Sequence, residues 1–143
     1  MSLRYKDKII VLSTLLKFGN NKNYVSNTSA GGVVCGVDHN GKLTEFGYDK
    51  KFNKRFEHPF TRKQFKNISL PNFCDLEKII VSCHELLPHF NLVAWDFGLD
   101  NLSQYILIEY NLLGPGLNDH QVIDGPIFEK YLDEICALSF PRV

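Results

Sequence analysis

The stretch of sequence that decides the fold covers residues 92–111 and reads LVAWDFGLDNLSQYILIEYN. Apolar and β-branched residues dominate both of its ends, and the polar run at residues 100–103 separates them. Two such runs on either side of a turn cluster are typical of a β-hairpin. We therefore expect one strand over residues 92–99, a turn at residues 100–103 and a second strand over residues 104–111.

The register of this hairpin decides which polar side chains meet. Residues two apart in a strand share a face, and directly opposite residues of two paired strands do so as well. A two-residue turn at residues 101–102 sets Asp96 opposite Leu107 and diagonal to Glu109, at about 7–8 Å between Cα atoms. Asp96, Glu109 and Asn111 then project from one face. A three-residue turn would send Asp96 to the opposite face.

These three side chains form a candidate metal site. An ionised carboxylate at the end of an apolar run costs free energy if it is buried without a partner, so a compensating cation is expected. Two carboxylates and an amide oxygen are hard ligands, which suit Mg²⁺ better than zinc or copper. The alternative is that Glu109 pairs with a lysine or arginine and that Asn111 caps a turn.

The remaining sequence predicts strands before the hairpin and helices on both sides of it. Residues 8–48 are expected to form strands, with a type I′ hairpin turn at Asn40 and Gly41. Residues 72–87 predict a helix that Asn72 caps. A last helix is expected over about residues 126–138. The apolar positions expected to face the core are Leu76, Ile79, Ile80, Cys83, Leu86 and Leu87 in the first helix, and Phe128, Tyr131, Leu132, Ile135 and Leu138 in the second.

Composition and charge limit the function classes. The chain has 143 residues, and its 16 Lys and Arg balance its 16 Asp and Glu. This is one domain's worth of sequence, expected over residues 1–143. Zero net charge argues against a dedicated nucleic-acid binder and against a polybasic membrane-surface protein. No apolar run approaches the roughly 20 residues of a membrane span, and the N-terminus shows no signal-peptide pattern.

The cysteines indicate a reducing compartment. The four are Cys35, Cys74, Cys83 and Cys136, and they form no C-x-x-C pair. Together with the five histidines they show no zinc-like spacing. We expect reduced, mostly buried thiols in a cytoplasmic protein.

Residues 49–66 form a basic stretch with seven Lys and Arg residues and interleaved phenylalanines, which we interpret as a loop insertion. It is either a solvated connection whose phenylalanines pack back on the domain or an anion-binding loop for a phosphate or carboxylate. A third alternative is that its aromatic rings stack on single-stranded nucleic acid, against which the zero net charge argues.

Several ordered stretches resemble a known family. They are NTSAGG at residues 27–32, GYDKKF at 47–52, HP at 58–59, LVAWD at 92–96, IEYN at 108–111, GPGL at 114–117 and HQ at 120–121. In this order they resemble the ATP-grasp superfamily, and within it the branch found with sugar-transfer and cell-surface polysaccharide genes. The similarity runs over about residues 9–130, which is nearly the whole chain.

The resemblance implies a fold and a reaction. The fold is α+β, an antiparallel β-sheet with helices packed on one face, as in the C-terminal half of an ATP-grasp fold. The reaction joins a carboxylate to a nucleophile through an acyl phosphate made from ATP, with Mg²⁺ as the metal. Asp96, Glu109 and Asn111 fall on the metal ligands of the family.

The resemblance also assigns the phosphate side of the site. Asn27, with Gly31 and Gly32, falls on the segment that faces the reacting phosphate, where glycines let backbone N–H groups approach an anion. From the residues alone, a plain turn between strands is an equally good interpretation. Lys17 lies near the position where related sequences often carry an arginine, so the resemblance implies a catalytic role in binding phosphate. A lysine there keeps the positive charge of the arginine but not its bidentate hydrogen-bonding geometry.

The resemblance covers the second half of the ATP-grasp pattern only. We expect either a part of a ligase that an N-terminal half completes, or a truncated and catalytically inactive binding or assembly module. The expected partners are therefore ATP and a carboxylate substrate for the ligase, and an N-terminal half or a second copy of this chain for the module. Exposed apolar surface would favour such self-association. Nucleic acid and a membrane span are not expected.

Overall fold

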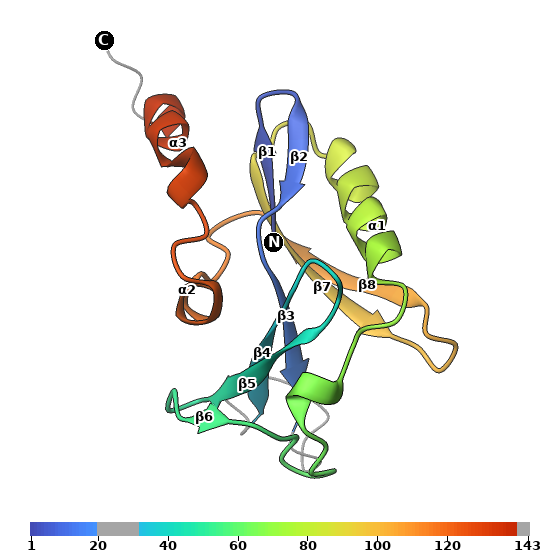
Figure 1. The fold of residues 1–143 in the computed structure, drawn as a ribbon. Coiled ribbons are helices and arrows are strands. Elements are labelled where there is room, and N and C mark those ends of the chain that lie inside the picture. The colour runs from blue at the N-terminus through green and yellow to red at the C-terminus, as the bar shows by residue number, and fades with distance from the viewer. Residues whose placement is uncertain (20–31, 140–143) are drawn as a thin grey trace.

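The computed structural model describes residues 1–19 and 32–139, and Figure 1 draws its elements. The strands are β1 (Ser2–Tyr5), β2 (Lys8–Val11), β3 (Thr14–Phe18), β4 (Val33–Val37), β5 (Leu43–Asp49), β6 (Lys54–Arg55), β7 (Leu92–Leu99) and β8 (Tyr105–Asn111). The α-helices are α1 (Phe73–Glu85), α2 (Asn118–Asp124) and α3 (Leu132–Ser139), and the 3-10 helices are η2 (Phe65–Asn67) and η3 (Glu129–Tyr131).

The described strands form two antiparallel sheets of four strands each. Their orders are β2-β1-β7-β8 and β3-β4-β5-β6. The α+β class and the antiparallel pairing are confirmed, but the expectation of one sheet is wrong. Only two residues, Leu12 and Ser13, separate β2 from β3, so the chain passes directly from the first sheet into the second.

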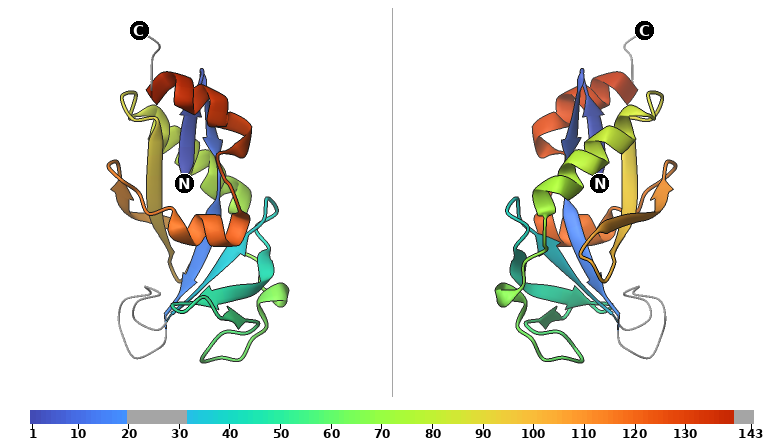
Figure 2. Two further views of the ribbon diagram at one scale, coloured as in Figure 1. Left: turned by 90° about the vertical axis from the view of Figure 1, so that its left-hand side faces the viewer. Right: turned by 90° about the vertical axis from the view of Figure 1, so that its right-hand side faces the viewer.

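The expectation that the helices cover one face is also wrong. Helix α1 packs against β1 and β2, whereas α2 packs against β4 of the other sheet. Figure 2 shows α1 and α3 on opposite sides of the β1–β2 hairpin. On the α3 side, the ring of Tyr131 packs on that of Tyr5 with centroids 4.9 Å apart.

The hydrophobic core joins the second sheet to α1. The second sheet contributes Cys35, which is fully buried, and α1 contributes Phe73, Leu76 and Ile80. Phe65 of η2 fills the space between them and is also fully buried. Trp95 and Phe97 of β7 pack against this cluster from the first sheet. The odd-numbered residues of β7 therefore face the core.

Helix α1 buries a face one residue away from the expected one. Its buried residues are Phe73, Leu76, Ile80 and His84, whereas Ile79 and Leu86 are 36% and 80% exposed. Leu76 and Ile80 are buried as expected, but the apolar pattern could not indicate His84, a polar residue that is buried near the C-terminal end of the helix. The expected cap is wrong as well. Asn72 has φ 51° and no capping side-chain hydrogen bond, and its carbonyl oxygen accepts the N–H of Asp75 at 2.9 Å.

The hairpin turn between β4 and β5 contains three residues. Asp38 N–H donates to the carbonyl of Lys42, and Gly41 N–H donates to the carbonyl of Asp38. Gly41 has φ 79°, but Asn40 does not have a positive φ. The expected type I′ turn, which needs positive φ at both central residues, is therefore wrong.

The C-terminal segment contains one helix that the sequence pattern missed. The expected helix over about residues 126–138 corresponds to η3 and α3, and α2 precedes both. The expected buried stripe is wrong at Leu132, which is 54% exposed, and Phe128, Tyr131 and Ile135 are only half-buried.

A buried hydrogen-bond chain ties β1, α1 and β7 together. His84 Nε2 lies 2.8 Å from the carbonyl oxygen of Phe90, which can only accept, so Nε2 carries the proton. Ser2 then donates its hydroxyl to His84 Nδ1 at 2.7 Å and accepts Trp95 Nε1–H at 2.7 Å. The side-chain polar atoms of Ser2, His84 and Trp95 are thus all hydrogen-bonded. Burial lowers the pKa of His84.

Helix α2 approaches β4 at a glycine. A Cβ on Gly36 would lie 2.6 Å from Cγ2 of Ile123 and 2.9 Å from Cγ2 of Thr44. No side chain fits at that distance, so Gly36 lets α2 lie directly on the sheet.

Replacing His84 should change how stability depends on pH. An unfolded histidine binds a proton at about pH 6.5, while folded His84 binds it only at lower pH. The unfolded chain therefore holds more protons below pH 6.5, and the free energy of unfolding should fall as the pH drops from 7.5 to 5.5. His84→Gln should cost about 1–3 kcal/mol at pH 7.5 and reduce this fall. Urea titrations at both pH values measure both effects, and an equal pH dependence in the two proteins would contradict the assignment.

Enlarging Gly36 should displace α2. We expect Gly36→Ala to cost about 1–3 kcal/mol in urea unfolding, because the added methyl group overlaps Ile123. The double variant with Ile123→Ala should recover part of that loss. Gly116→Ala is the matched control, because a Cβ there meets nothing within 4 Å. A loss that Ile123→Ala does not reduce would show that α2 is not the element displaced.

Candidate functional site

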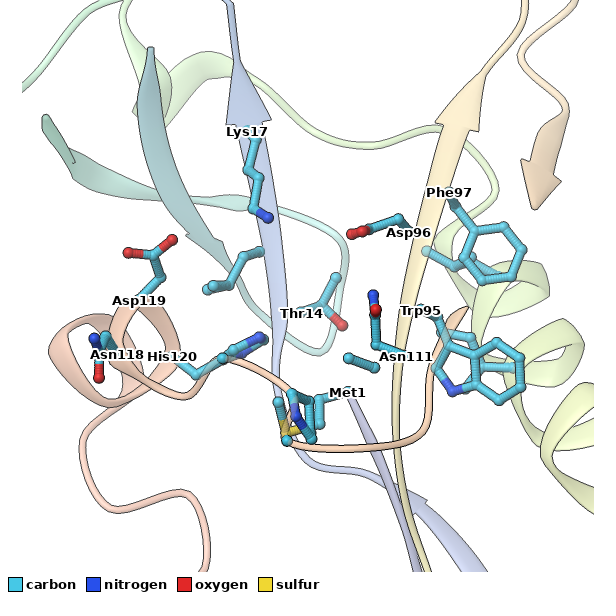
Figure 3. A pocket seen from close by; sticks show the side chains of 17 residues that line it. Met1, Thr14, Lys17, Trp95, Asp96, Phe97, Asn111, Asn118, Asp119 and His120 are labelled. Atoms are coloured by element: carbon cyan, nitrogen blue, oxygen red, sulfur yellow. The ribbon is translucent and has the colours of Figure 1, made fainter. Parts of the chain in front are cut away.

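A cleft of about 480 Å³ lies between β3, β7 and α2, and Figure 3 shows the side chains around it. Lys17 of β3 reaches into it from one wall, and Asp96 of β7 points toward the same space from the other (Figure 3). Asn111, at the end of β8, and His120 of α2 also belong to the polar lining. Trp95 and Phe97, also in the lining, turn away from these polar groups toward the core side (Figure 3).

The turn of the β7–β8 hairpin differs from the expected one. Asp100 N–H donates to the carbonyl of Gln104 at 3.0 Å, and Ser103 N–H donates to the carbonyl of Asp100 at 3.1 Å. The turn therefore contains three residues, and Ser103 adopts φ 60°. The expected two-residue turn is wrong. In a regular ladder this register would have sent Asp96 and Glu109 to opposite faces of the sheet.

A β-bulge in β8 brings Asp96 and Glu109 back to the same face of the sheet. The pairing runs Leu99↔Tyr105 and Phe97↔Leu107, then shifts by one residue to Asp96↔Glu109. Ile108 is the extra residue in β8. Directly opposite residues share a face, so Glu109 lies on the Asp96 side while Leu107 lies on the core side with Phe97. The carboxylates are thus opposite each other rather than diagonal.

The candidate metal ligands differ in how they relate to the cleft. Asp96 and Asn111 line it, and Glu109 is not among the described residues that do. Asn111 opposes Ala94 in the ladder, which puts it two positions along from Glu109 on the same face. Asn111 Nδ2 lies 3.5 Å from Glu109 Oε1, which leaves Asn111 Oδ1 free of that contact. All three candidate ligands therefore lie on one side of the hairpin.

The predicted residues of the phosphate side are only partly described. Asn27 and Gly31 lie outside the described residues. Gly32 is buried immediately before β4, and it is not in the described lining of the cleft. Lys17 is exposed and lines the cleft, so it joins Asp96 and Asn111 there.

Helix α2 brings further polar groups that sequence reasoning did not assign. Asn118, Asp119 and His120 line the cleft. His120 Nδ1 lies 2.5 Å from the hydroxyl of Ser13, a buried residue 107 positions earlier in the chain. Burial lowers the pKa of His120 to about 4. The HQ pair at residues 120–121 is a local sequence signal. The contact between Ser13 and His120 joins residues 107 positions apart, so no local pattern in the sequence could indicate it.

The basic stretch at residues 49–66 contains some regular secondary structure. It contains β6 and the start of η2, and a cavity of about 830 Å³ lies beside it. Its phenylalanines differ, because Phe65 is fully buried while Phe52, Phe56 and Phe60 are 54%, 53% and 64% exposed. Phe56 still packs on Phe46, with ring centroids 5.9 Å apart, so the expectation that the phenylalanines pack back on the domain is wrong only for Phe52 and Phe60.

Both arginines in this stretch are already paired. Arg55 binds Asp49 at 2.7 Å, and Arg62 binds Glu57 at 2.8 Å. Hydrogen bonds from the Arg55 guanidinium lower the pKa of Asp49. Binding of an anion or a nucleic acid by this stretch stays a prediction.

The cysteines are free, as expected, but not mostly buried. Cys35 is buried, Cys83 is half-buried, and Cys74 and Cys136 are exposed. Burial raises the pKa of the Cys35 thiol to about 12.

None of the helices in the described part of the chain has the length and the apolar composition that a membrane span needs.

Comparison with known proteins adds one finding. A family model described as "Sugar-transfer associated ATP-grasp" matches residues 2–137. No curated protein and no solved structure matches the chain. The matched residues run from β1 into α3 and so include the β7–β8 hairpin, the cleft and α2.

Proposed function

We propose a function on the premise that this chain belongs to the sugar-transfer associated ATP-grasp family. The chain contributes the metal- and ATP-binding cleft of a carboxylate ligase associated with cell-surface polysaccharide synthesis. In the proposed reaction, ATP phosphorylates a carboxylate, and a nucleophile then displaces phosphate from the resulting acyl phosphate.

The observation that carries this proposal is the pairing of Asp96 with Glu109 across the bulge. A regular ladder from the same turn would have turned Glu109 toward the core, on the side of Trp95. The strand instead inserts Ile108 and leaves both carboxylates on one face, with Asn111 beside them. Bulges that re-aim a side chain are over-represented next to active sites.

The chemistry of these side chains fits Mg²⁺. Asp96, Glu109 and Asn111 offer carboxylate and amide oxygens, which Mg²⁺ accepts together with waters and substrate phosphates. Such an ion, when bound, supplies positive charge to phosphate oxygens during transfer. Lys17, on the opposite wall, provides a second positive charge within the cleft. In the proposal, Asn27 is a catalytic residue that faces the reacting phosphate, and Gly31 and Gly32 let backbone N–H groups approach the phosphate oxygens.

Removing either carboxylate should weaken Mg–ATP binding. A ligand that binds the folded state raises its melting temperature, so Mg–ATP should raise that of the wild-type chain. We expect Asp96→Asn and Glu109→Gln each to weaken the affinity, measured by isothermal titration calorimetry, about tenfold or more. Glu129→Gln, an exposed carboxylate on η3, is the matched control and should bind as the wild type does.

An unchanged melting temperature at millimolar Mg–ATP would contradict the ligase proposal for this chain. Equal affinities of the wild type and both carboxylate variants would instead show that ATP binds elsewhere. Either result would favour the alternative, a catalytically inactive ATP-grasp-like binding or assembly module.

A specific observation favours this alternative. Strand β8 is at the edge of its sheet, and its apolar residues Ile106, Ile108 and Tyr110 are 52%, 70% and 48% exposed. An exposed apolar edge strand offers unpaired backbone groups to another strand. In the alternative, a second copy of this chain or an N-terminal half covers β8.

The alternative predicts self-association. We expect multi-angle light scattering to give a mass above that of one chain, increasing with concentration. Ile108→Lys should shift the protein toward the monomer, because it puts a charge on the apolar edge. Val122→Lys, at an exposed position on α2, is the control for an added charge elsewhere. A wild-type monomer at all concentrations would contradict self-association through β8.

A further inference from the structure

A hydrogen-bonded triad lies beside the proposed metal ligands and shares no residue with them. Ser13, in the two-residue link between β2 and β3, is 6% exposed. Its hydroxyl donates to Asp124 Oδ2 at 2.5 Å and lies 2.5 Å from His120 Nδ1. His120 and Asp124 are four residues apart on α2 and therefore lie on the same side of the helix.

The number of protons in this triad fixes the state of the imidazole. A serine hydroxyl carries one hydrogen, and an ionised carboxylate can only accept. Once Ser13 donates to Asp124, it can only accept from His120. His120 must then donate Nδ1–H, which leaves its Nε2 unprotonated in the neutral ring.

The His120 ring, with its unprotonated Nε2, lines the cleft. The His120 side chain points toward the space between Lys17 and Asn111 (Figure 3), and it is part of the cleft lining. Within the described part of the chain, no hydrogen bond engages His120 Nε2.

The surroundings keep the ring neutral at physiological pH. Burial is the main cause that lowers the pKa of His120 to about 4. The amino group of Met1, which donates to the Ser13 carbonyl, and Lys17 lower it further, whereas Asp96 raises it. Desolvation raises the pKa of Asp124, and the hydrogen bond from Ser13 lowers it.

We infer that His120 Nε2 is the proton acceptor of this cleft and that Ser13 and Asp124 hold it in that state. The inference rests on the proposed function and specifies its second step. The nucleophile forms a bond to the acyl carbon, the bond from that carbon to the phosphate oxygen breaks, and phosphate leaves with the electron pair. The proton that the nucleophile loses passes to His120 Nε2.

This assignment also defines the class of nucleophile. A lone pair accepts from an N–H or O–H group, so the cleft suits an amine or a hydroxyl. The carboxylate of Asp119 lines the same cleft and favours a positively charged nucleophile. An ammonium group passes one proton to His120 Nε2, which frees its lone pair for attack, and its second proton leaves with phosphate. A thiolate has no proton to lose and would gain nothing from His120.

The tautomer can be measured directly. In ¹⁵N-labelled wild-type protein at pH 7, two-bond proton–nitrogen correlation spectra should show His120 with protonated Nδ1 and unprotonated Nε2. Asp124→Ala removes the acceptor of Ser13, whose hydroxyl should then turn to Nδ1 and move the proton to Nε2. Ser13→Ala should give a mixture of both forms. Asp119→Asn alters a neighbouring carboxylate on α2 without touching Ser13, and it should keep the wild-type tautomer.

A protonated Nε2 in the wild type would overturn the inference, and so would a tautomer that does not respond to Asp124→Ala.

The second measurement uses ethylammonium chloride as the simplest primary ammonium probe. The His120 Nε2 resonance should move with this probe and not with sodium chloride at equal ionic strength. A resonance that responds equally to both salts would overturn the assignment to a proton-bearing nucleophile.

Measurements of Mg–ATP binding distinguish a failure of the proposed function from a failure of the inference about His120. His120→Gln should keep Mg–ATP binding within about twofold of the wild type, because His120 is not among the proposed ligands. A wild-type chain that binds no Mg–ATP overturns the reaction assigned to His120 even where the tautomer is as inferred. A loss of Mg–ATP binding in His120→Gln alone overturns the separation between the proton acceptor and the metal site.

Discussion

Strand β7 has to serve two sides of the molecule at once, and the two-residue period of a strand is the constraint on which the arrangement depends. Its odd-numbered residues Trp95 and Phe97 pack on the core, and Trp95 also donates to Ser2. Asp96 therefore has to point the other way, toward the cleft. A slip of one residue would bury the carboxylate and expose the tryptophan, so the core fixes the orientation of the candidate ligand.

Strand β8 lies at the edge of its sheet and is mostly exposed, and its register was harder to predict from the sequence. The hairpin and the bounds of β7 could be predicted, because apolar runs and a polar turn are local signals. The turn length could not, because Ser103 occupies the left-handed position where glycine is the usual signal. The bulge at Ile108 left no signal either. The expectation that Asp96 and Glu109 share a face is therefore confirmed through a register that differs from the predicted one.

The same local chemistry explains the other turns. Asp38, Asp49 and Asp100 each open a three-residue turn and accept backbone N–H groups two and four residues later. Only the first has glycine at the left-handed position, and the others have Phe52 and Ser103 there. The aspartate that binds its own turn is therefore the feature that the three turns share, and the left-handed residue differs between them. Contacts between distant segments, such as Ser13 with His120, remain outside what a local pattern can indicate.

The link between the two sheets has a mechanical consequence. Leu12 and Ser13 are its only residues, and both are tied to Met1: Leu12 N–H donates to the Met1 carbonyl at 3.0 Å, and the Ser13 carbonyl accepts the Met1 amino group at 2.8 Å. These two hydrogen bonds hold the link to the start of β1. A change in the separation of the walls that carry Lys17 and Asp96 would strain this link, so the N-terminal residue of the chain helps to set the width of the cleft.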